Sequence, residues 1–319
     1  MDDTVVMCEC FARDGLQHEE VFVPTASKVA LLESFVRAGF TRIEASSYSH
    51  PRRIPAFADV SDVLAAAPRR SGVAFKATCP NPRAVERAIT DQDAGHGAEE
   101  LSLLVSATES HTQRNLRTTR ADQWANVTEM ATLAKGRFTL VGVVSVAFGC
   151  PFEGQVPMSR VVEDVERFVD LGVDIITLGD TTGQGTPRTI APVFRQLTTD
   201  HPDVAMVAHF HNTRGTALAN CVAALDAGCR HFDSAFGGVG GHPAQIEYGS
   251  GMTGNAATED LVSLFESMGV DTALDLGAVM DASRLCEDVL GRQLHSMVAR
   301  AGLDTARTTT PQTKETADA

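Results

Sequence analysis

The chain of 319 residues is 43% hydrophobic, enough to build a large core, and it carries 27 Lys and Arg against 41 Asp and Glu. The resulting formal charge of −14 argues against nucleic acid or an anionic membrane surface as a partner. No apolar run is long enough to cross a bilayer, no targeting peptide opens the chain, and an odd number of cysteines, 7, is typical of free thiols, so we expect a cytoplasmic protein.

Short apolar runs rich in β-forming residues recur along the chain. They cover residues 5–10, 42–47, 73–79, 99–106, 138–148, 174–179, 204–211 and 231–236. Between some of them, apolar residues repeat every three or four positions, as in 27–38, 161–171 and 217–227, and a glycine suited to a helix C-cap follows. Strands that alternate with helices in this way predict parallel βα units, and the number of units predicts a closed (β/α)8 TIM barrel.

We expect this barrel, completed by C-terminal helices, to form one domain over residues 1–302. Residues 303–319 are rich in threonine and charge and lack an apolar period, which predicts a short flexible polar tail. The alternative α/β fold, an open doubly wound sheet, should carry a glycine-rich dinucleotide fingerprint after its first strand. Residues 10–15 do not match that fingerprint, so the closed barrel is favoured.

The seventh run ends in the sequence His209-Phe210-His211. Side chains two positions apart on a strand point to the same face, so these two imidazoles can share a metal ion. Two partly buried histidines that bond to backbone carbonyls are the alternative for an isolated pair of this kind. The other strand ends decide between the two.

Ionisable residues occur at the ends of other predicted strands as well. Arg13 and Asp14 follow the first strand, Glu44 lies in the second, and Asp180 follows the sixth. The active site of a TIM barrel lies at the C-terminal ends of its strands. Any one of these residues alone is ordinary for a surface loop, but their common position at strand ends, shared with the histidine pair, predicts a site.

The chain carries six ordered motifs of a known family. They are Arg13-Asp14-Gly15-Leu16-Gln17, Ile43-Glu44, Gly149-Cys150-Pro151-Phe152-Glu153-Gly154, Leu178-Gly179-Asp180-Thr181, the pair His209 and His211, and Gly254-Asn255-Ala256-Ala257-Thr258-Glu259-Asp260-Leu261. With these motifs the chain resembles the 3-hydroxy-3-methylglutaryl-CoA lyase family of metal-dependent TIM barrels, over about residues 13–269. The resemblance implies C–C cleavage of a 3-hydroxyacyl-CoA thioester.

The resemblance implies that Asp14, His209, His211 and Asn255 bind a divalent cation. One carboxylate, two imidazoles and an amide oxygen suit Mg²⁺ or Mn²⁺ with open positions better than a closed structural Zn²⁺ site. Asn255 also precedes a helical pattern, so a role as a helix cap is the alternative for this residue, and the two roles are compatible.

The implied reaction is a retro-Claisen cleavage, with 3-hydroxy-3-methylglutaryl-CoA split into acetyl-CoA and acetoacetate as the main expectation. Arg13 is the candidate for stabilising negative charge on the substrate, because its guanidinium is always charged. Asp180 is the candidate base, and Glu44 the candidate for orienting Arg13 or the water shell of the metal. A structural ion pair is the alternative role for both Glu44 and Asp180.

Two residues depart from the family pattern. His242 stands where the lyases carry a loop cysteine that is thought to protonate the enolate, and Glu20 stands where they carry lysine. Because the imidazole pKa is near neutrality, His242 can serve as the general acid. The same change can mark a different substrate, such as citramalyl-CoA or another branched 3-hydroxyacyl-CoA.

An acyl-CoA thioester is the expected partner, and its phosphates require cations. The candidates are Arg52, Arg53, Lys76, Arg114, Arg117 and Arg120, each of which can instead be a solvated surface residue. The rival functions are an aldolase or Claisen-type synthase acting on a free acid, and a non-catalytic barrel that binds acyl-CoA. We also expect a homodimer or a higher homo-oligomer.

Overall fold

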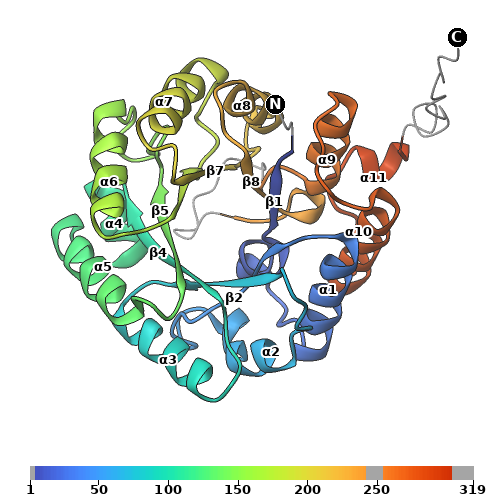
Figure 1. The fold of residues 1–319 in the computed structure, drawn as a ribbon. Coiled ribbons are helices and arrows are strands. Elements are labelled where there is room, and N and C mark those ends of the chain that lie inside the picture. Colours follow the sequence, from blue (N-terminus) through green and yellow to red (C-terminus); the bar gives the residue numbers. More distant parts are fainter. Residues whose placement is uncertain (1–3, 242–253, 304–319) are drawn as a thin grey trace, which may run out of the picture.

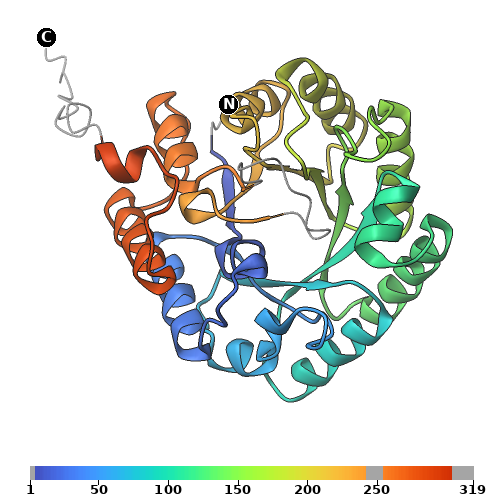
Figure 2. The same cartoon turned by 180° about the vertical axis from the view of Figure 1, so that it is seen from behind.

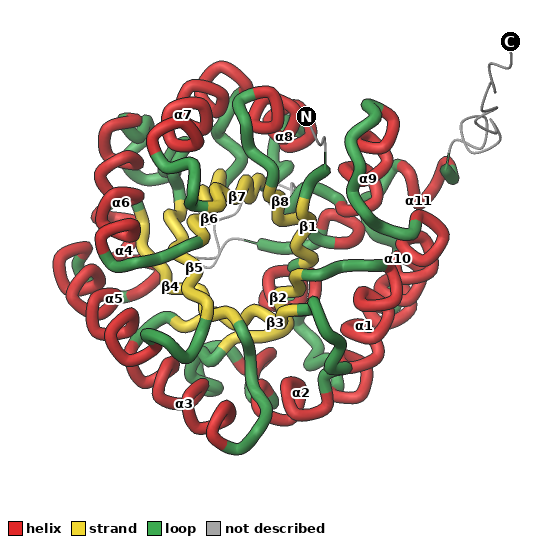
Figure 3. The backbone as a smooth tube through the Cα atoms, in the orientation of Figure 1, coloured by secondary structure: helices red, strands yellow, loops and turns green. Residues whose placement is uncertain are grey.

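The structure is a computed structural model that describes residues 4–241 and 254–303. Eight parallel strands pair in chain order, and β8 closes on β1. Their bounds are β1 Val6–Glu9, β2 Arg42–Ser47, β3 Ala74–Cys79, β4 Glu100–Ser106, β5 Thr139–Ser145, β6 Ile175–Asp180, β7 Ala205–Phe210 and β8 His231–Ser234. The strands form an inner ring and the helices an outer ring (Figure 1, Figure 3), so the predicted TIM barrel is confirmed.

The helices follow the strands around the barrel. They are α1 Thr25–Ala38, α2 Val60–Ala66, α3 Pro82–Asp93, α4 Glu109–Leu116, α5 Arg120–Ala134, α6 Met158–Asp170, α7 Pro187–Asp200, α8 Ala217–Asp226, α9 Thr258–Ser267, α10 Leu276–Leu290 and α11 Val298–Ala301. Helices α9 to α11 complete the ring between α8 and α1, as both views show (Figure 1, Figure 2). None of the described helices is long and apolar enough to cross a membrane.

The helix and strand ends follow from local chemistry. Helix α1 ends at Ala38 because Gly39 takes the left-handed conformation, with φ of 102°, and its N–H closes the last turn. Strand β5 is shorter than predicted: it stops at Ser145 because Val146 also takes a positive φ, 52°, which a strand cannot contain.

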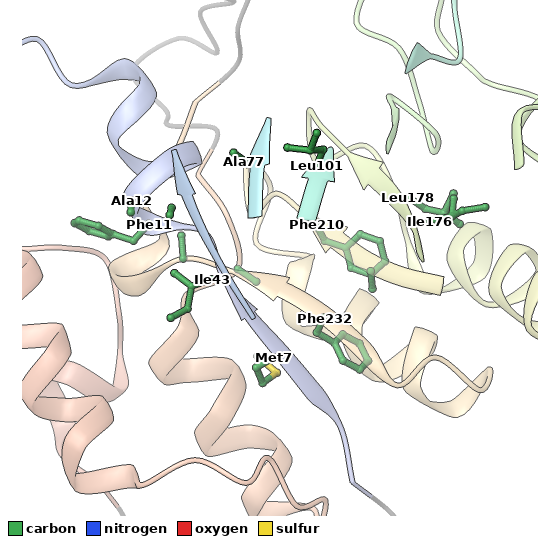
Figure 4. Close-up of a cluster of buried hydrophobic side chains, with 14 of the residues drawn as sticks. Met7, Phe11, Ala12, Ile43, Ala77, Leu101, Ile176, Leu178, Phe210 and Phe232 are labelled. Atoms are coloured by element: carbon green, nitrogen blue, oxygen red, sulfur yellow. The ribbon is translucent and has the colours of Figure 1, made fainter. Parts of the chain in front are cut away.

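Two different environments lie on the two faces of the sheet. Outward-facing strand residues such as Ile43, Leu101, Phe210 and Phe232 pack under the helices in a continuous apolar core (Figure 4). Inward-facing residues alternate with them and are largely polar, as at Glu44. The strands therefore present their chemistry to the barrel interior, and the apolar core lies outside it.

Candidate active site

A cavity of about 500 Å³ opens at the C-terminal ends of the strands. Its walls combine inward-facing strand residues with residues of the loops that follow the strands, among them Arg13, Asp14, Glu44, His209 and His211. The strand-end position predicted for the site therefore holds the expected residues of β1, β2 and β7 around one space. Its volume is in the range of small-molecule sites.

Asp14 and the two histidines form the centre of the site. The Nε2 atoms of His209 and His211 lie 3.2 Å apart, and Asp14 Oδ2 lies 3.6 Å from Nε2 of His211 and 4.0 Å from that of His209. Two ligand atoms at right angles and about 2.2 Å from one ion are about 3.1 Å apart, so this spacing fits a common cation. His209 is an inward residue of β7, while Asp14 lies in a π-helical turn, Phe11–Gly15, directly after β1. Single π-turns of this kind are frequent at functional sites.

Asn255 completes the cluster. Its Nδ2 donates to Asp14 Oδ2 at 2.6 Å and to the carbonyl of Val239 at 2.9 Å, and its backbone forms a β-bridge with His211. The buried Oδ1 has no hydrogen-bond partner among the described residues. An unpartnered buried oxygen on a side chain that contacts Asp14 fits a fourth ligand of a cation. The alternative role as a helix cap is wrong, because α9 begins at Thr258 with Ala257 as its N-cap.

Arg13 is held between two carboxylates. Its Nη1 donates to Asp14 Oδ1 at 2.7 Å and its Nη2 donates to Glu44 Oε2 at 2.8 Å, while Thr78 donates to the other oxygen of Glu44 at 2.7 Å. Burial alone raises the pKa of Glu44 and of Asp14, but the Arg13 guanidinium and further nearby groups lower both by more, so both carboxylates stay ionised. The structure thus places Glu44 where it orients Arg13.

Asp180 is not brought into this cluster. Its Oδ1 accepts the backbone N–H of Gln184 at 2.8 Å and its Oδ2 that of Gly185 at 2.9 Å, so the carboxylate holds the loop before α7. Of the described residues, Gly179 and Thr181 line the cavity but Asp180 does not. Burial raises the pKa of Asp180 to about 6 despite these two hydrogen bonds. Each oxygen keeps a free lone pair, but Asp180 lies outside the cavity lining, so its loop would have to move before the carboxylate could act as a base on a substrate in the cavity.

Two charged residues, Asp233 and Lys76, contact each other and, through Asp233, the histidine pair, but they were not recognised as a pair from the sequence. Asp233 Oδ2 lies 3.3 Å from His209 Nδ1, which orients that imidazole, and accepts from Lys76 Nζ at 3.4 Å. Lys76, proposed above for a CoA phosphate, is only 2% exposed and lies between Glu44 and Asp233 in the barrel interior, which argues against that role. The sequence did contain a signal for this pair: Lys76 is a charged residue at an inward position of an apolar strand, and such a buried charge requires a partner of opposite charge.

A family model described as HMGL-like matches residues 4–286. The chain belongs to the HMGL-like family. Hydroxymethylglutaryl-CoA lyase YngG of Bacillus subtilis is 36% identical over 92% of this chain and 95% of that protein. The (R)-citramalyl-CoA lyase of Chloroflexus aurantiacus is 35% identical over 94% of this chain and 95% of that protein.

The fold of this chain is also similar to solved structures of HMG-CoA lyases. An HMG-CoA lyase from Acinetobacter baumannii, in complex with coenzyme A and 3-methylmalate, superposes with a TM-score of 0.88 over 98% of this chain and 99% of that chain, at 36% identity. The HMG-CoA lyase of Bacillus subtilis superposes with a TM-score of 0.87 over 94% and 98%, at 34% identity. The resemblance to the lyase family and the fold are confirmed.

The glycine-rich loop after β8 approaches the cluster closely in this HMGL-like protein. A Cβ at Gly240 would lie 2.5 Å from Asn255 Nδ2 and 3.2 Å from Asp14 Oδ2, so only glycine fits there. Gly241 lines the cavity. His242, the predicted general acid, lies outside the described residues, and Glu20 is exposed.

The cations at the mouth of the cavity differ in part from those expected. Arg53 lines it, as expected for a phosphate ligand, and so do Arg83 and Arg87, which the sequence did not single out. Arg120 instead forms an ion pair with Asp164 at 2.7 Å. The other three candidates are not among the described residues that line the cavity. Arg52 is exposed, Arg114 lies 4.2 Å over the ring of Phe152, and Arg117 is the C-cap of α4.

Proposed function

We propose that this protein cleaves a 3-hydroxyacyl-CoA, with 3-hydroxy-3-methylglutaryl-CoA giving acetyl-CoA and acetoacetate as the main reaction. The observation that carries the proposal is the cluster of Asp14, His209 and His211 beside Arg13, at the mouth of an enclosed cavity. We propose Mg²⁺ or Mn²⁺ as the cation, held by these three residues and Asn255. When bound, the cation supplies Lewis acidity that favours ionisation of the substrate hydroxyl.

The residues of the chain account for the remaining chemistry. Cleavage of the bond between the hydroxyl-bearing carbon and its neighbour leaves a ketone and moves the electron pair onto a thioester enolate. Arg13 stabilises this negative charge, and Glu44 fixes the guanidinium for that purpose before substrate binds. Asp180 remains the proposed base, by way of a loop rearrangement, and His242 the proposed acid that protonates the enolate carbon.

Citramalyl-CoA is the second candidate substrate. Two observations favour it: the citramalyl-CoA lyase of Chloroflexus aurantiacus is nearly as similar to this chain as the hydroxymethylglutaryl-CoA lyase, and His242 replaces the cysteine of the latter's family. The Acinetobacter baumannii neighbour binds coenzyme A together with 3-methylmalate, a hydroxy acid with two carboxylates. We therefore propose that the cavity takes an acyl-CoA with a short branched hydroxyacyl group.

The mouth arginines support this choice of ligand. Arg53, Arg83 and Arg87 lie on one side of the opening, on the segments that follow β2 and β3. Together they offer positive charge to the CoA phosphates on a protein that is otherwise strongly acidic. We further propose a cytoplasmic, homo-oligomeric protein. All 7 cysteines are free and buried, which supports a reducing compartment, and light scattering on a sizing column tests the assembly.

A turnover assay tests the function. The purified protein is given 3-hydroxy-3-methylglutaryl-CoA, citramalyl-CoA or the corresponding free acids, each with Mg²⁺ or Mn²⁺. Release of the keto acid, acetoacetate or pyruvate, is measured for every substrate, and release of acetyl-CoA is measured for the thioesters. Cleavage of a thioester that His209→Ala abolishes supports the proposal. Activity confined to free acids would indicate an aldolase, and acyl-CoA binding without turnover of either thioester would indicate a non-catalytic barrel.

A further inference from the structure

The floor of the cavity is a polar layer formed by the even-numbered strands. One inward residue from each of these strands lines it, and together they are called the polar floor: Glu44, Ser102, Thr177 and Asp233. In the strand register, Glu44 of β2 lies opposite Lys76 of β3, and Lys76 lies opposite Glu100 of β4. The barrel is staggered by one residue per strand, so two strands along, Ser102 rather than Glu100 lies level with Glu44. Bulky apolar side chains usually fill such layers in TIM barrels, so a wholly polar layer calls for an explanation.

Several atoms of the polar floor lack hydrogen-bond partners. Within the described part of the chain, Ser102 Oγ, Thr177 Oγ1 and Asp233 Oδ1 are buried and unpartnered. Ser102 is 1% exposed and Thr177 is 2% exposed. Burying such groups without partners destabilises a protein, and folded proteins rarely leave them so. A cavity surface that carries three of them together is suited to polar atoms of a ligand.

Lys76 reaches the same floor from β3. Its ammonium lies 3.4 Å from Asp233 Oδ2 and 3.8 Å from Glu44 Oε2, whereas charge-assisted hydrogen bonds are about 2.7–2.9 Å long. An ammonium has three donors, so these two long contacts leave donors for a ligand. Lys76 is linked to the cluster of Asp14, His209 and His211 through Asp233. Asp233 lies 3.3 Å from His209 Nδ1 and 3.4 Å from the Lys76 ammonium. A group one or two carbons beyond the substrate hydroxyl can span that separation.

The charges of the site favour an anion at this position. Arg13 and Lys76 face three carboxylates, those of Asp14, Glu44 and Asp233. A bound divalent cation turns this excess of one negative charge into an excess of one positive charge. A single carboxylate on the acyl chain then makes the enclosed site neutral, which a neutral acyl group does not do.

We infer that Lys76 and Ser102 bind a carboxylate at the far end of the acyl chain and so select 3-hydroxyacyl-CoA substrates that carry one. This inference rests on the proposed function and adds the residues that determine specificity. The Thr177 hydroxyl provides a further donor for the group, whereas Asp233, which can only accept, holds the Lys76 ammonium in place. The arginines at the mouth serve the CoA phosphates, whereas Lys76 serves the acyl end.

A matched pair of thioesters tests the inference. 3-Hydroxyglutaryl-CoA and 3-hydroxybutyryl-CoA differ by a carboxylate in place of a hydrogen, and their Kd values are measured by calorimetry with Mg²⁺ present. The native protein is expected to prefer the carboxylate by about tenfold or more, the scale of hydrogen bonds to a charged group. Ser102→Ala should reduce this ratio several-fold, and Lys76→Met should abolish it. Ser46→Ala removes another buried unpartnered hydroxyl, one that lies on β2 outside the described cavity lining, and should keep the native ratio.

The outcomes separate the two proposals. Ser102→Ala removes a hydroxyl that has no partner among the described residues, so the variant should keep the native melting temperature. If Lys76→Met fails to fold, the Kd ratio of Ser102→Ala alone tests the inference. A native ratio in Ser102→Ala overturns the inference, and where the protein still cleaves 3-hydroxy-3-methylglutaryl-CoA the proposed function stands. If neither thioester binds the native protein and no 3-hydroxyacyl-CoA is cleaved, both proposals fall.

Discussion

Replacing Glu44 by glutamine tests whether the Arg13 position depends on this carboxylate. The change keeps the shape of the side chain but removes the charge that Arg13 Nη2 contacts at 2.8 Å, in a pair whose side chains are 15% and 2% exposed. Removing one partner of a buried ion pair costs about 3–5 kcal/mol. Arg13 keeps Asp14 as a second partner, so the lower end, about 3 kcal/mol, is expected.

That loss converts into a measurable shift in melting temperature. The entropy of unfolding is about 2.1 cal/mol/K per residue, or about 0.7 kcal/mol/K for this chain, so Glu44→Gln should lower Tm by roughly 4–5 °C. Because a misplacement of about 1 Å can cost about 100-fold in rate, kcat should fall by about that factor while KM changes little. Differential scanning calorimetry and the acetyl-CoA assay give the two numbers.

The pH dependence gives an independent check. Folding lowers the pKa of Glu44 below its ordinary value of 4.5, because Arg13 and Lys76 outweigh the effect of burial. The stability that the ionised carboxylate contributes is therefore fully present above about pH 4.5 and is lost as the pH falls through the lowered pKa. The Tm difference between native protein and Glu44→Gln should shrink over that acidic range.

A control variant and a refuting result complete the experiment. Glu163 pairs with Arg160 at the surface, where the two side chains are 67% and 46% exposed, so Glu163→Gln should leave both Tm and kcat unchanged. If Glu44→Gln keeps the native Tm and a kcat within twofold of native, Arg13 does not depend on Glu44 and the reasoning fails.

Three further predictions concern the cation and the reacting groups. His211→Ala should retain the native circular dichroism spectrum but lose the increase in Tm that Mn²⁺ gives to the native protein, and an equal increase in the variant would show that His211 is not a ligand. Arg13→Lys should lose mainly kcat, because an ammonium cannot contact Asp14 and Glu44 through one planar group; a change confined to KM would make Arg13 a binding residue only. His242→Ala should lose one limb of the pH profile of kcat/KM, and an unchanged profile would assign the proton to another donor.

The local patterns of the sequence were sufficient for the barrel and for the position of the site at its strand ends, while the proposed cation ligands came from the resemblance to the lyase family. Alternation along β7 put His209 inside the barrel, and the rule that strand ends carry the chemistry joined it to Asp14 and Glu44, because parallel strands place their C-terminal ends at one face. The exact length of β5 did not follow, since the positive φ of Val146 is imposed by its surroundings: its N–H binds Thr181, which lies on another unit of the barrel.

The surroundings of Asp180 and Lys76 were revealed only by tertiary structure. Asp180 ends a strand as the site residues do, but its carboxylate accepts two backbone N–H groups of its own loop, and strand position alone does not reveal that. The inward position of Lys76 on β3 indicates that it needs a partner but does not say which one. Closure of the barrel places it between Glu44 of β2 and Asp233 of β8. A residue's type and period predict the face that it occupies. Which charges meet across the barrel depends on closure and stagger, and these join residues far apart in the chain.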